Sequence, residues 1–278
     1  MTQRILVTGG NAGIGFALCK QLTYDHGCHV YLGSRSMEKG TAAAKTIVDG
    51  LPASCKGTCE VVQLDTSSDA SVASAVAAVK GSLEVEGSQL YAVVNNAGTG
   101  LNHGVGPEEV LNTNLFGPKR VVEGFLPLLD KSGRIVNMGS GAGPMYVAKC
   151  SPDVKKMLCS PEITWEQILE HSKSGLGSAA DGMGGYGLSK ALLHCYTMLL
   201  AKQHPDLVVS CCSPGFIDTA MTKGFGASKT PEEGTVSARH CLFQKLDGNG
   251  WYYGSDAVRS PLHFMRNPGE PPYNGEPV

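Results

Sequence analysis

Short apolar segments alternate with longer helix-like segments along most of this chain of 278 residues. The strands we expect are Arg4–Thr8, Cys28–Gly33, Glu60–Leu64, Leu90–Asn95, Gly133–Met138, Leu207–Cys212 and Trp251–Tyr253. The helices we expect are Gly13–Tyr24, Met37–Val48, Asp69–Lys80, Glu108–Leu129 and Tyr186–Gln203. Most of the strands are nearly continuous apolar runs, which is typical of parallel strands buried on both faces. The pattern predicts an α/β fold with a single doubly wound parallel sheet and helices on both faces, in which ligands bind beyond the carboxyl ends of the strands.

Two segments interrupt this alternation. Residues 141–185 separate the fifth strand from its helix by far more than the usual few residues. The helices expected inside this insertion are Asp153–Leu158 and Thr164–Ser172. A mobile, glycine-rich stretch is expected at Gly175–Gly185, and the proline- and glycine-rich tail 261–278 should lie extended on the surface. We therefore predict one catalytic, dinucleotide-binding domain, 1–260, that contains the insertion and is followed by the tail.

Composition and charge exclude several classes of function. The formal net charge is −2 and the pI is about 6.4, so that no basic field is available for nucleic acid or an anionic membrane. The ten cysteines lack the paired spacing of a zinc site and are expected to be small buried hydrophobes in a reducing compartment, with no metal bound. The chain enters a strand at its start, which leaves no room for a targeting peptide, and no apolar run approaches the roughly 20 residues of a membrane span. These features predict a cytoplasmic enzyme that acts on a small molecule.

A glycine-rich loop joins the first expected strand to the first helix, with glycines in the spacing Gly9-x3-Gly13-x-Gly15. At such a junction the main chain can approach a dinucleotide closely, and the helix N-terminus attracts its pyrophosphate. The residues we expect to bind the cofactor here are Thr8, Gly9, Asn11, Gly13, Ile14 and Gly15. The spacing differs from G-x-G-x-x-G, and the alternative is ordinary turn chemistry.

The end of the second strand discriminates between the two nicotinamide cofactors. Enzymes that use NAD typically carry an acidic residue there, which binds the ribose hydroxyls. This chain has Arg35 and no carboxylate at that place, and a guanidinium suits the 2′-phosphate of NADP. An ordinary surface arginine is the alternative for this residue alone. Beside the glycine loop, Arg35 favours NADP(H).

Tyr186 and Lys190 are four residues apart, so that a phenol and an ammonium lie on one face of a helix. The ammonium and the positive charge of an oxidised nicotinamide should lower the pKa of the tyrosine, which is ordinarily about 10. Such a tyrosine can donate a proton to a carbonyl oxygen as hydride reaches the carbon. Ser140, which ends the fifth strand, would stabilise the developing negative charge. Taken alone, a Tyr/Lys pair at this spacing is usually a solvated helix face, and a serine after a strand is most often a turn residue.

In their order along the chain, these motifs resemble the classical short-chain dehydrogenase/reductase family, and more narrowly its monomeric NADPH-dependent carbonyl reductases. The resemblance extends from about residue 3 to about residue 258. Its motifs are Thr8–Gly15, Asp65, Asn95–Gly98, Asn112–Asn114, Ser140, Tyr186 with Lys190, and Pro214–Thr219. The narrower resemblance rests on Asn112–Pro118, Thr230–Gly234 and the long insertion before Tyr186. It implies a Rossmann-type sheet.

The resemblance also implies roles for individual residues. The catalytic tetrad would be Asn114, Ser140, Tyr186 and Lys190. Asn114 would hold a water beside Lys190 in a proton relay, and Lys190 would also bond the nicotinamide ribose. Asp65 would contact the adenine edge and Asn96 the adenosine side. The carboxamide end of the nicotinamide would be held by Pro214, Ile217 and Thr219. Without the resemblance, Asp65 would be interpreted as a helix cap and Asn114 as a buried polar group of a helix.

The chain departs from the pattern at two places. Related carbonyl reductases often carry a lysine in the glycine loop where this chain has Ala12, so that Arg35 would act with less help and the preference for NADP would weaken. The insertion differs in detail and is expected to form one wall of the substrate pocket. The apolar residues considered for that pocket are Met145, Tyr146, Met183, Phe216 and Phe225. In the carbonyl reductases the insertion covers the helix face through which classical members dimerise, which implies a monomer.

The chain is therefore predicted to reduce a ketone, aldehyde or quinone to an alcohol with NADPH, with Tyr186 as the proton donor. One alternative is a non-catalytic NADP-binding regulator on the same fold. The other is an NAD-dependent alcohol dehydrogenase.

Overall fold

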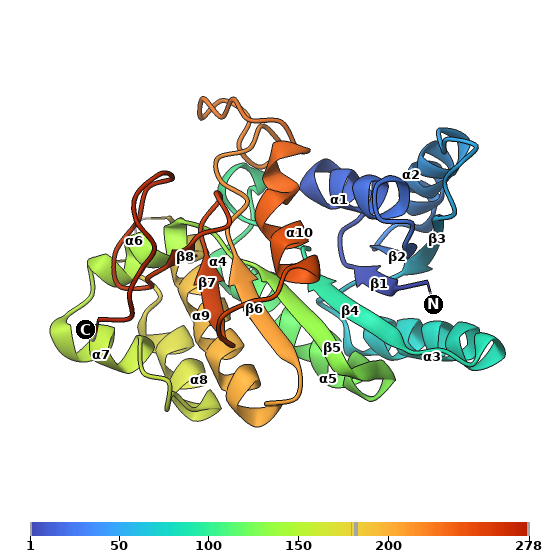
Figure 1. Cartoon of the computed structure of the whole chain (residues 1–278). Coiled ribbons are helices and arrows are strands. Elements are labelled where there is room, and N and C mark those ends of the chain that lie inside the picture. Colours follow the sequence, from blue (N-terminus) through green and yellow to red (C-terminus); the bar gives the residue numbers. More distant parts are fainter. Residues whose placement is uncertain (1, 179, 181–182, 277–278) are drawn as a thin grey trace.

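A computed structural model describes residues 2–178, 180 and 183–276. Eight strands form one sheet in the order β3-β2-β1-β4-β5-β6-β7-β8 (Figure 1). The strands are β1 (Arg4–Val7), β2 (His29–Ser34), β3 (Thr58–Gln63), β4 (Leu90–Asn95), β5 (Leu129–Met138), β6 (Val208–Cys212), β7 (Trp251–Tyr253) and β8 (Arg259–Ser260). All neighbouring strands are parallel except β7 and β8. The prediction of a single doubly wound sheet is confirmed.

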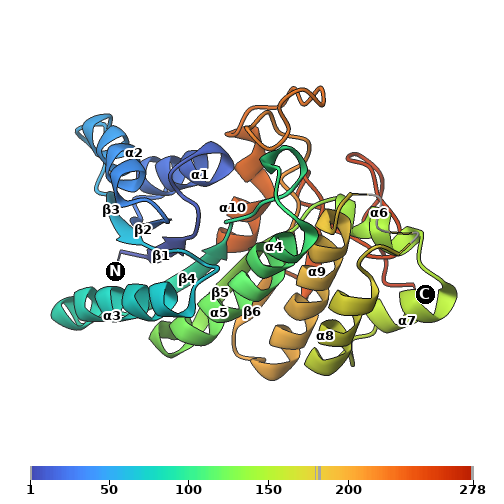
Figure 2. The same ribbon diagram turned by 180° about the vertical axis from the view of Figure 1, so that it is seen from behind.

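Helices cover both faces of the sheet (Figures 1 and 2). They are α1 (Gly13–Tyr24), α2 (Met37–Asp49), α3 (Asp69–Glu86), α4 (Pro107–Leu111), α5 (Gly117–Phe125), α6 (Ala142–Ala148), α7 (Pro152–Leu158), α8 (Trp165–Ser174), α9 (Tyr186–Gln203) and α10 (Val236–Phe243). Several begin at a residue whose side chain accepts a hydrogen bond from the first turn: Ser36 for α2, Ser68 for α3 and Thr164 for α8. At α8 the cap is a complete capping box with Gln167.

The sheet separates two apolar clusters, because neighbouring residues of a strand point to opposite faces. In β1, Leu6 belongs to one cluster and Ile5 to the other, and both are completely buried. The Leu6 cluster is completed by α3, α5 and α9, and the Ile5 cluster by α1, α2 and α10. Both faces of β1 are therefore covered, which explains why its sequence is apolar without alternation.

The strand order reverses between β1 and β4, since β2 and β3 lie on one side of this pair and β5 to β8 on the other. The connections that follow β1 and β4 leave the sheet in opposite directions at this point. The carboxyl ends of the two strands therefore border a crevice, which is the usual ligand site in open α/β sheets.

Several elements differ from the sequence-based expectations. The single helix expected over 108–129 is divided into α4, a π-helical turn at Asn112–Phe116, α5 and a short 3₁₀ turn at Leu126–Leu128, and β5 starts already at Leu129. Helix α6 was not expected, because the glycines and the proline of 141–144 are typical of a loop. The antiparallel β8 was also missed.

The insertion packs against α9 from outside, as α8 lies alongside α9 in Figure 2. Every residue of α9 from Gly187 to Thr197 is buried, because the insertion covers the side that the sheet leaves open. The glycine-rich stretch expected to be mobile, Gly175–Gly185, falls partly outside the described residues, which exclude 179, 181 and 182. The tail does not simply lie on the surface, because Leu262 and Arg266 are buried. None of the helices in the described part of the chain has both the length and the apolar character needed to cross a membrane.

Candidate active site

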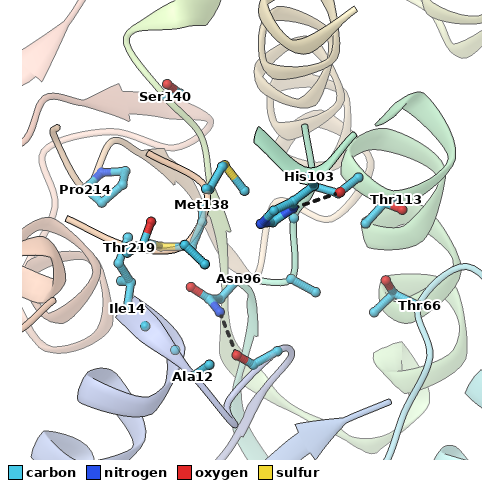
Figure 3. A pocket seen from close by; sticks show the side chains of 18 of the residues that line it. Ala12, Ile14, Thr66, Asn96, His103, Thr113, Met138, Ser140, Pro214 and Thr219 are labelled. Carbon is cyan, nitrogen blue, oxygen red and sulfur yellow. Dashed lines mark hydrogen bonds between the residues drawn. The ribbon is translucent and has the colours of Figure 1, made fainter. Parts of the chain in front are cut away.

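A cleft of about 620 Å³ lies at the carboxyl ends of the central strands. Fourteen of the residues singled out from the sequence line it: Gly9, Asn11, Gly13, Ile14, Gly15, Arg35, Asp65, Asn96, Ser140, Tyr186, Lys190, Pro214, Ile217 and Thr219. Figure 3 shows Ile14, Pro214 and Thr219 gathered on one side and His103, Thr113 and Thr66 on the other. The cleft thus unites segments from the first to the last third of the chain.

The glycine loop is packed so tightly that Gly15 leaves no room for a side chain and Gly9 leaves little. A Cβ built on Gly15 would lie 2.3 Å from the carbonyl oxygen of Gly9 and 2.4 Å from Nδ2 of Asn96. Gly9 has φ +65°, in the left-handed region that favours glycine, and a Cβ there would lie 3.0 Å from Cα of Ala97. The loop therefore presents main-chain groups to the cleft at the start of α1, as an incoming pyrophosphate requires.

Thr8 is the one glycine-loop residue of the prediction that does not line the cleft. It is only 1% exposed, and its Oγ1 accepts hydrogen bonds from the backbone N–H groups of Asn96 (3.0 Å) and Ala97 (2.9 Å). Asn96 returns a bond from Nδ2 to the carbonyl oxygen of Thr8 at 2.9 Å. Thr8 thus ties the glycine loop to the end of β4, which is a positioning role, and its direct contact with a cofactor stays a prediction.

The two residues expected at the adenosine end lie on the segments that follow β2 and β3. Arg35 is exposed, and among residues 2–178, 180 and 183–276 no carboxylate pairs with its guanidinium. Asp65 accepts hydrogen bonds at Oδ1 from the backbone N–H (3.0 Å) and the hydroxyl (2.6 Å) of Ser67. It therefore closes a local turn, while the N-cap of α3 is Ser68, so that the helix-cap interpretation of Asp65 is wrong.

The phenol and the ammonium meet at the other end of the cleft. Tyr186 and Lys190 occupy the first and second turns of α9, and Nζ of Lys190 lies 5.7 Å from the centre of the Tyr186 ring. Lys190 is 6% exposed and donates from Nζ to the carbonyl oxygen of Met138 at 2.8 Å. Met138 ends β5, and Ser140, two residues later, is hydrogen-bonded to the hydroxyl of Tyr186. The three polar side chains are thus held by β5 and α9 together.

Burial controls the ionisation of both groups. It lowers the pKa of Lys190 to about 8, because the ammonium has lost its hydration. Burial also raises the pKa of Tyr186, and the hydrogen bond with Ser140 only partly offsets this rise. The prediction that the lysine lowers the pKa of Tyr186 is therefore wrong for the protein without cofactor, since desolvation is the dominant effect. Tyr186 consequently holds its proton firmly at neutral pH.

Asn114 does not line the cleft but lies directly behind it, in the π-helical turn. Its side chain is completely buried; Oδ1 accepts from the backbone N–H of Thr99 (2.8 Å) and Nδ2 donates to the carbonyl oxygen of Thr99 (2.9 Å) and to Oγ of Ser189 (3.0 Å). A Cβ built on Gly98 would lie 3.4 Å from Oδ1 of Asn114 and 3.6 Å from Nζ of Lys190, so that both atoms approach the same point. Single π-helical turns are frequent at functional sites.

The segment that starts at Pro214 closes the cleft opposite the glycine loop. A Cβ built on Gly13 would lie 3.4 Å from Cγ2 of Thr219, which brings the two loops into contact. The backbone N–H of Thr219 donates to Oγ1 of Thr222 at 3.0 Å, and Ile217 pairs with Lys229 in an isolated bridge. These contacts hold the segment at the site expected for the carboxamide.

Sequence reasoning missed several residues that line the cleft: His103, Val105, Glu109, Met138, Ala220, Met221 and Thr222. The positions of some of them depend on irregular backbone, such as the turn that holds His103, in which Leu101 has φ +50°. Of the apolar candidates for the substrate pocket, Tyr146 is instead buried, with its hydroxyl 2.9 Å from Nε2 of His171. None of the five apolar candidates is among the described lining residues of the cleft.

Sequence similarity agrees with this geometry. Residues 3–152 match the model of the short chain dehydrogenase family. The chain belongs to the short-chain dehydrogenase/reductase family and is an oxidoreductase. It is 34% identical over 274 residues to (+)-neomenthol dehydrogenase of Arabidopsis thaliana, which covers 85% of this chain and 90% of that protein. It is 28% identical over 266 residues to the NADPH carbonyl reductase 1 of Homo sapiens, covering 88% and 92%.

Solved structures agree as well. Salutaridine reductase from Papaver somniferum superposes with a TM-score of 0.76 at 27% identity, covering 90% of this chain and 99% of that one. The menthone neomenthol reductase from Mentha piperita gives a TM-score of 0.74 at 25% identity, covering 92% and 99%. The sequence-based resemblance to the family is therefore confirmed.

Proposed function

We propose that this protein reduces a ketone, aldehyde or quinone carbonyl to an alcohol with NADPH. The observation that carries the proposal is the meeting of Tyr186, Ser140 and Lys190 at one end of a cleft whose other end is built from a glycine loop. Relatives whose names include carbonyl reductase and neomenthol dehydrogenase support the same chemistry.

The choice of NADPH rests on the adenosine end of the cleft. Arg35 is exposed there with its donors available, and it suits a 2′-phosphate through charge-assisted hydrogen bonds. The glycine loop would hold the pyrophosphate, and Asp65 and Asn96 would contact the adenosine. In the cytoplasm, the compartment predicted above, NADP(H) is mostly reduced, which favours carbonyl reduction over alcohol oxidation.

The bound nicotinamide supplies the hydride that reaches the carbonyl carbon. The chain supplies the proton and the position of the substrate. Tyr186 holds a proton at neutral pH because burial raises its pKa, and it donates this proton to the carbonyl oxygen. Ser140 donates a hydrogen bond to the same oxygen as negative charge develops. Lys190 bonds the ribose, and Asn114 positions the Thr99 backbone behind it and supports the relay that returns a proton to Tyr186.

The direct test measures NADPH absorbance with a panel of ketones, aldehydes and quinones, with NADH in parallel. Tyr186→Phe should lower kcat by about 100- to 10,000-fold, because the proton donor is lost, and should leave the affinity for NADPH within about twofold of wild type. Tyr91→Phe is the matched control, since the Tyr91 hydroxyl donates to the carbonyl oxygen of Leu242, away from the cleft. Normal turnover by Tyr186→Phe contradicts the mechanism.

The alternatives give other results in the same assay. A regulator would bind NADPH without oxidising it in the presence of any carbonyl. An NAD-dependent alcohol dehydrogenase would prefer NADH to NADPH, and this preference would not change in Arg35→Asp.

We also propose that the enzyme is a monomer. Trp165 of α8 packs its ring against Tyr196 of α9 (5.8 Å between ring centres) and Phe116 (6.0 Å), with Nζ of Lys119 4.9 Å from its ring. The insertion thus occupies the surface of α5 and α9 through which classical members of the family pair. Light scattering after size exclusion should give a mass of about 29 kDa (29.1 kDa from the sequence) at micromolar concentration. A mass of twice this value contradicts the proposal.

A further inference from the structure

The C-terminal tail returns to the catalytic end of the cleft. Figures 1 and 2 both show it alongside α6. The thioether of Met265 contacts Gly141, because a Cβ built on Gly141 would lie 2.8 Å from both Sδ and Cε of Met265. Gly141 directly follows Ser140, whose side chain is hydrogen-bonded to Tyr186. The tail therefore reaches the corner of the chain that carries the proposed catalytic serine.

A buried arginine holds the tail in this place. Arg266 is 7% exposed, and its Nε donates to Oγ of Ser260 at 2.9 Å while Nη1 donates to the carbonyl oxygen of Glu270 at 2.6 Å. Its Nη2 forms an ion pair with Asp256, which also accepts from the backbone N–H of Gly269 at 3.1 Å. These bonds satisfy the guanidinium on three sides, as a buried charge requires.

The end of the tail at Tyr273 is hydrogen-bonded to the strand residue that precedes the tail, Arg259. The backbone N–H of Tyr273 donates to the carbonyl oxygen of Arg259 at 3.0 Å. The guanidinium of Arg259 stacks over Trp251 (3.6 Å to the ring centre) and also faces the Tyr273 ring at 5.2 Å. Phe264 packs edge-on against Tyr273, with ring centres 6.4 Å apart. Residues 259–273 therefore form a closed loop of the Ω type, a form that is frequently functional.

The turn between β7 and β8 links this loop to the segment that starts at Pro214. On one side it provides Asp256 for the ion pair with the tail. On the other side, Ser255 lies so close to Gly215 that a Cβ built on Gly215 would be 3.0 Å from that of Ser255. Ala257 in the same turn has φ +61°, a strained conformation for a residue with a side chain, and such strain is concentrated at functional sites.

We propose that Met265 is a specificity-determining residue, whose thioether packs against the apolar body of the carbonyl substrate; this assignment rests on the proposed function. The side chain is 45% exposed although its backbone is anchored on both sides. Met145 on α6, whose backbone N–H donates to the carbonyl oxygen of Gly141 at 3.1 Å, is 40% exposed. Exposed apolar side chains held at Gly141, the residue after Ser140, suit a bulky alicyclic or aromatic ketone. The flexible thioether adapts to its shape.

The test compares two ketones that share a reactive group and differ in bulk, cyclohexanone and 4-tert-butylcyclohexanone. Met265→Ala should lower kcat/KM for the bulky ketone about 10-fold, mainly through KM, and for cyclohexanone less than about twofold. Met265→Leu should keep the ratio of the two values within about twofold of wild type, because it restores the apolar volume. Val48→Ala, equally exposed at 45% but at the end of α2, is the control and should change neither value.

An unchanged ratio in Met265→Ala, or an equal loss for both ketones, overturns the assignment and leaves the proposed function intact. A wild-type enzyme that reduces neither these ketones nor the carbonyl panel contradicts the proposed function itself. The melting temperature of each variant separates a lost substrate contact from a damaged fold, and it should stay within about 2 °C of wild type.

Discussion

The two ends of the cleft recognise their ligands by different means. At the glycine loop the surface consists of main-chain atoms, because glycines carry no side chains. A Cβ built on Gly15 would lie 2.3 Å from the carbonyl oxygen of Gly9. At the catalytic end the surface is a set of polar side chains, of which Lys190 is 6% exposed and Ser140 and Tyr186 are half-buried. Ligand binding at the glycine loop should therefore be sensitive to added side-chain volume. The catalytic end should be sensitive to the ionisation of its side chains.

The two ends of the cleft also differ in how far apart their residues lie in the sequence. The glycine loop is one continuous stretch of eight residues, Thr8–Gly15, whereas the catalytic end combines β5, the π-helical turn, α9 and the tail. The local motif tolerates little change, although Thr8 also bonds it to Asn96 and Ala97 at the end of β4. The dispersed site depends on hydrogen bonds such as that from Nδ2 of Asn114 to Oγ of Ser189, which joins residues 75 positions apart in the sequence.

The largest effect on cofactor binding is expected from Gly15→Ala. The new methyl group cannot fit between the Gly9 carbonyl and Asn96, so the loop must move away from the pyrophosphate. We expect the affinity for NADPH, measured by fluorescence titration, to fall about 100-fold, which corresponds to about 2.7 kcal/mol.

Gly81→Ala is the matched control for this change. Gly81 lies within α3, and a Cβ there meets no atom within 4 Å, so that the affinity should be unchanged and the helix slightly more stable. Wild-type affinity in Gly15→Ala would mean that the loop does not approach the cofactor.

The second prediction concerns the catalytic end of the cleft. It follows the pH dependence of the free energy of unfolding in Lys190→Met. The pKa of Lys190 is about 8 in the folded protein and ordinarily about 10.4 in an unfolded chain. Between these values the unfolded state binds a proton that the folded state lacks, so the contribution of Lys190 to stability rises with pH. The free energy of unfolding of wild type minus that of the variant, from urea titrations, should rise by roughly 2 to 3 kcal/mol from about pH 8 to about pH 10.

Subtracting the variant removes the opposite trend of the buried thiols and phenols that do not interact with Lys190, which both proteins share. Lys173→Met on the exposed surface of α8 is the control, and its difference from wild type should be flat over the same range. A flat difference for Lys190→Met as well would show that the lysine is hydrated in the folded protein.

Much of this comparison could be predicted from the sequence. The glycine loop and the i, i+4 pair of α9 are local patterns, and the range predicted for α9 matches the structure. The apolar strand runs gave the sheet correctly, because parallel strands buried on both faces leave a composition that helices and loops do not.

The rest depends on contacts that no local pattern contains. Helix α6 forms from residues with loop-like composition because it packs on α9, and the π-helical turn arises where Asn114 bonds to the distant Thr99. The raised pKa of Tyr186 follows from burial, which charge spacing does not reveal. The contact between Met265 and Gly141 joins residues at opposite ends of the second half of the chain.

The third effect concerns charge at the adenosine end. Arg35→Asp should weaken NADPH binding about 30- to 100-fold, because the 2′-phosphate loses a charge-assisted partner and meets a carboxylate. NADH lacks that phosphate, and its affinity in the same variant should change less than about threefold. Lys131→Asp, on β5, makes the same change in net charge and should affect neither cofactor. An equal loss for both cofactors in Arg35→Asp would remove the basis for assigning NADPH.

The smallest expected effect is an increase in the affinity for NADPH, in Ala12→Lys. Ala12 is exposed at the start of α1 with φ −156°, an extended conformation that any residue adopts, and it lines the cleft. An ammonium placed there should tighten NADPH binding about two- to fivefold, as expected for an exposed charge pair of about 0.3 to 1 kcal/mol, and the gain should shrink at high salt. Ala12→Gln adds similar length without charge and should give no gain. If the lysine also restores part of the affinity lost in Arg35→Asp, the 2′-phosphate lies between the two positions; no gain in either background would place it out of reach of Ala12.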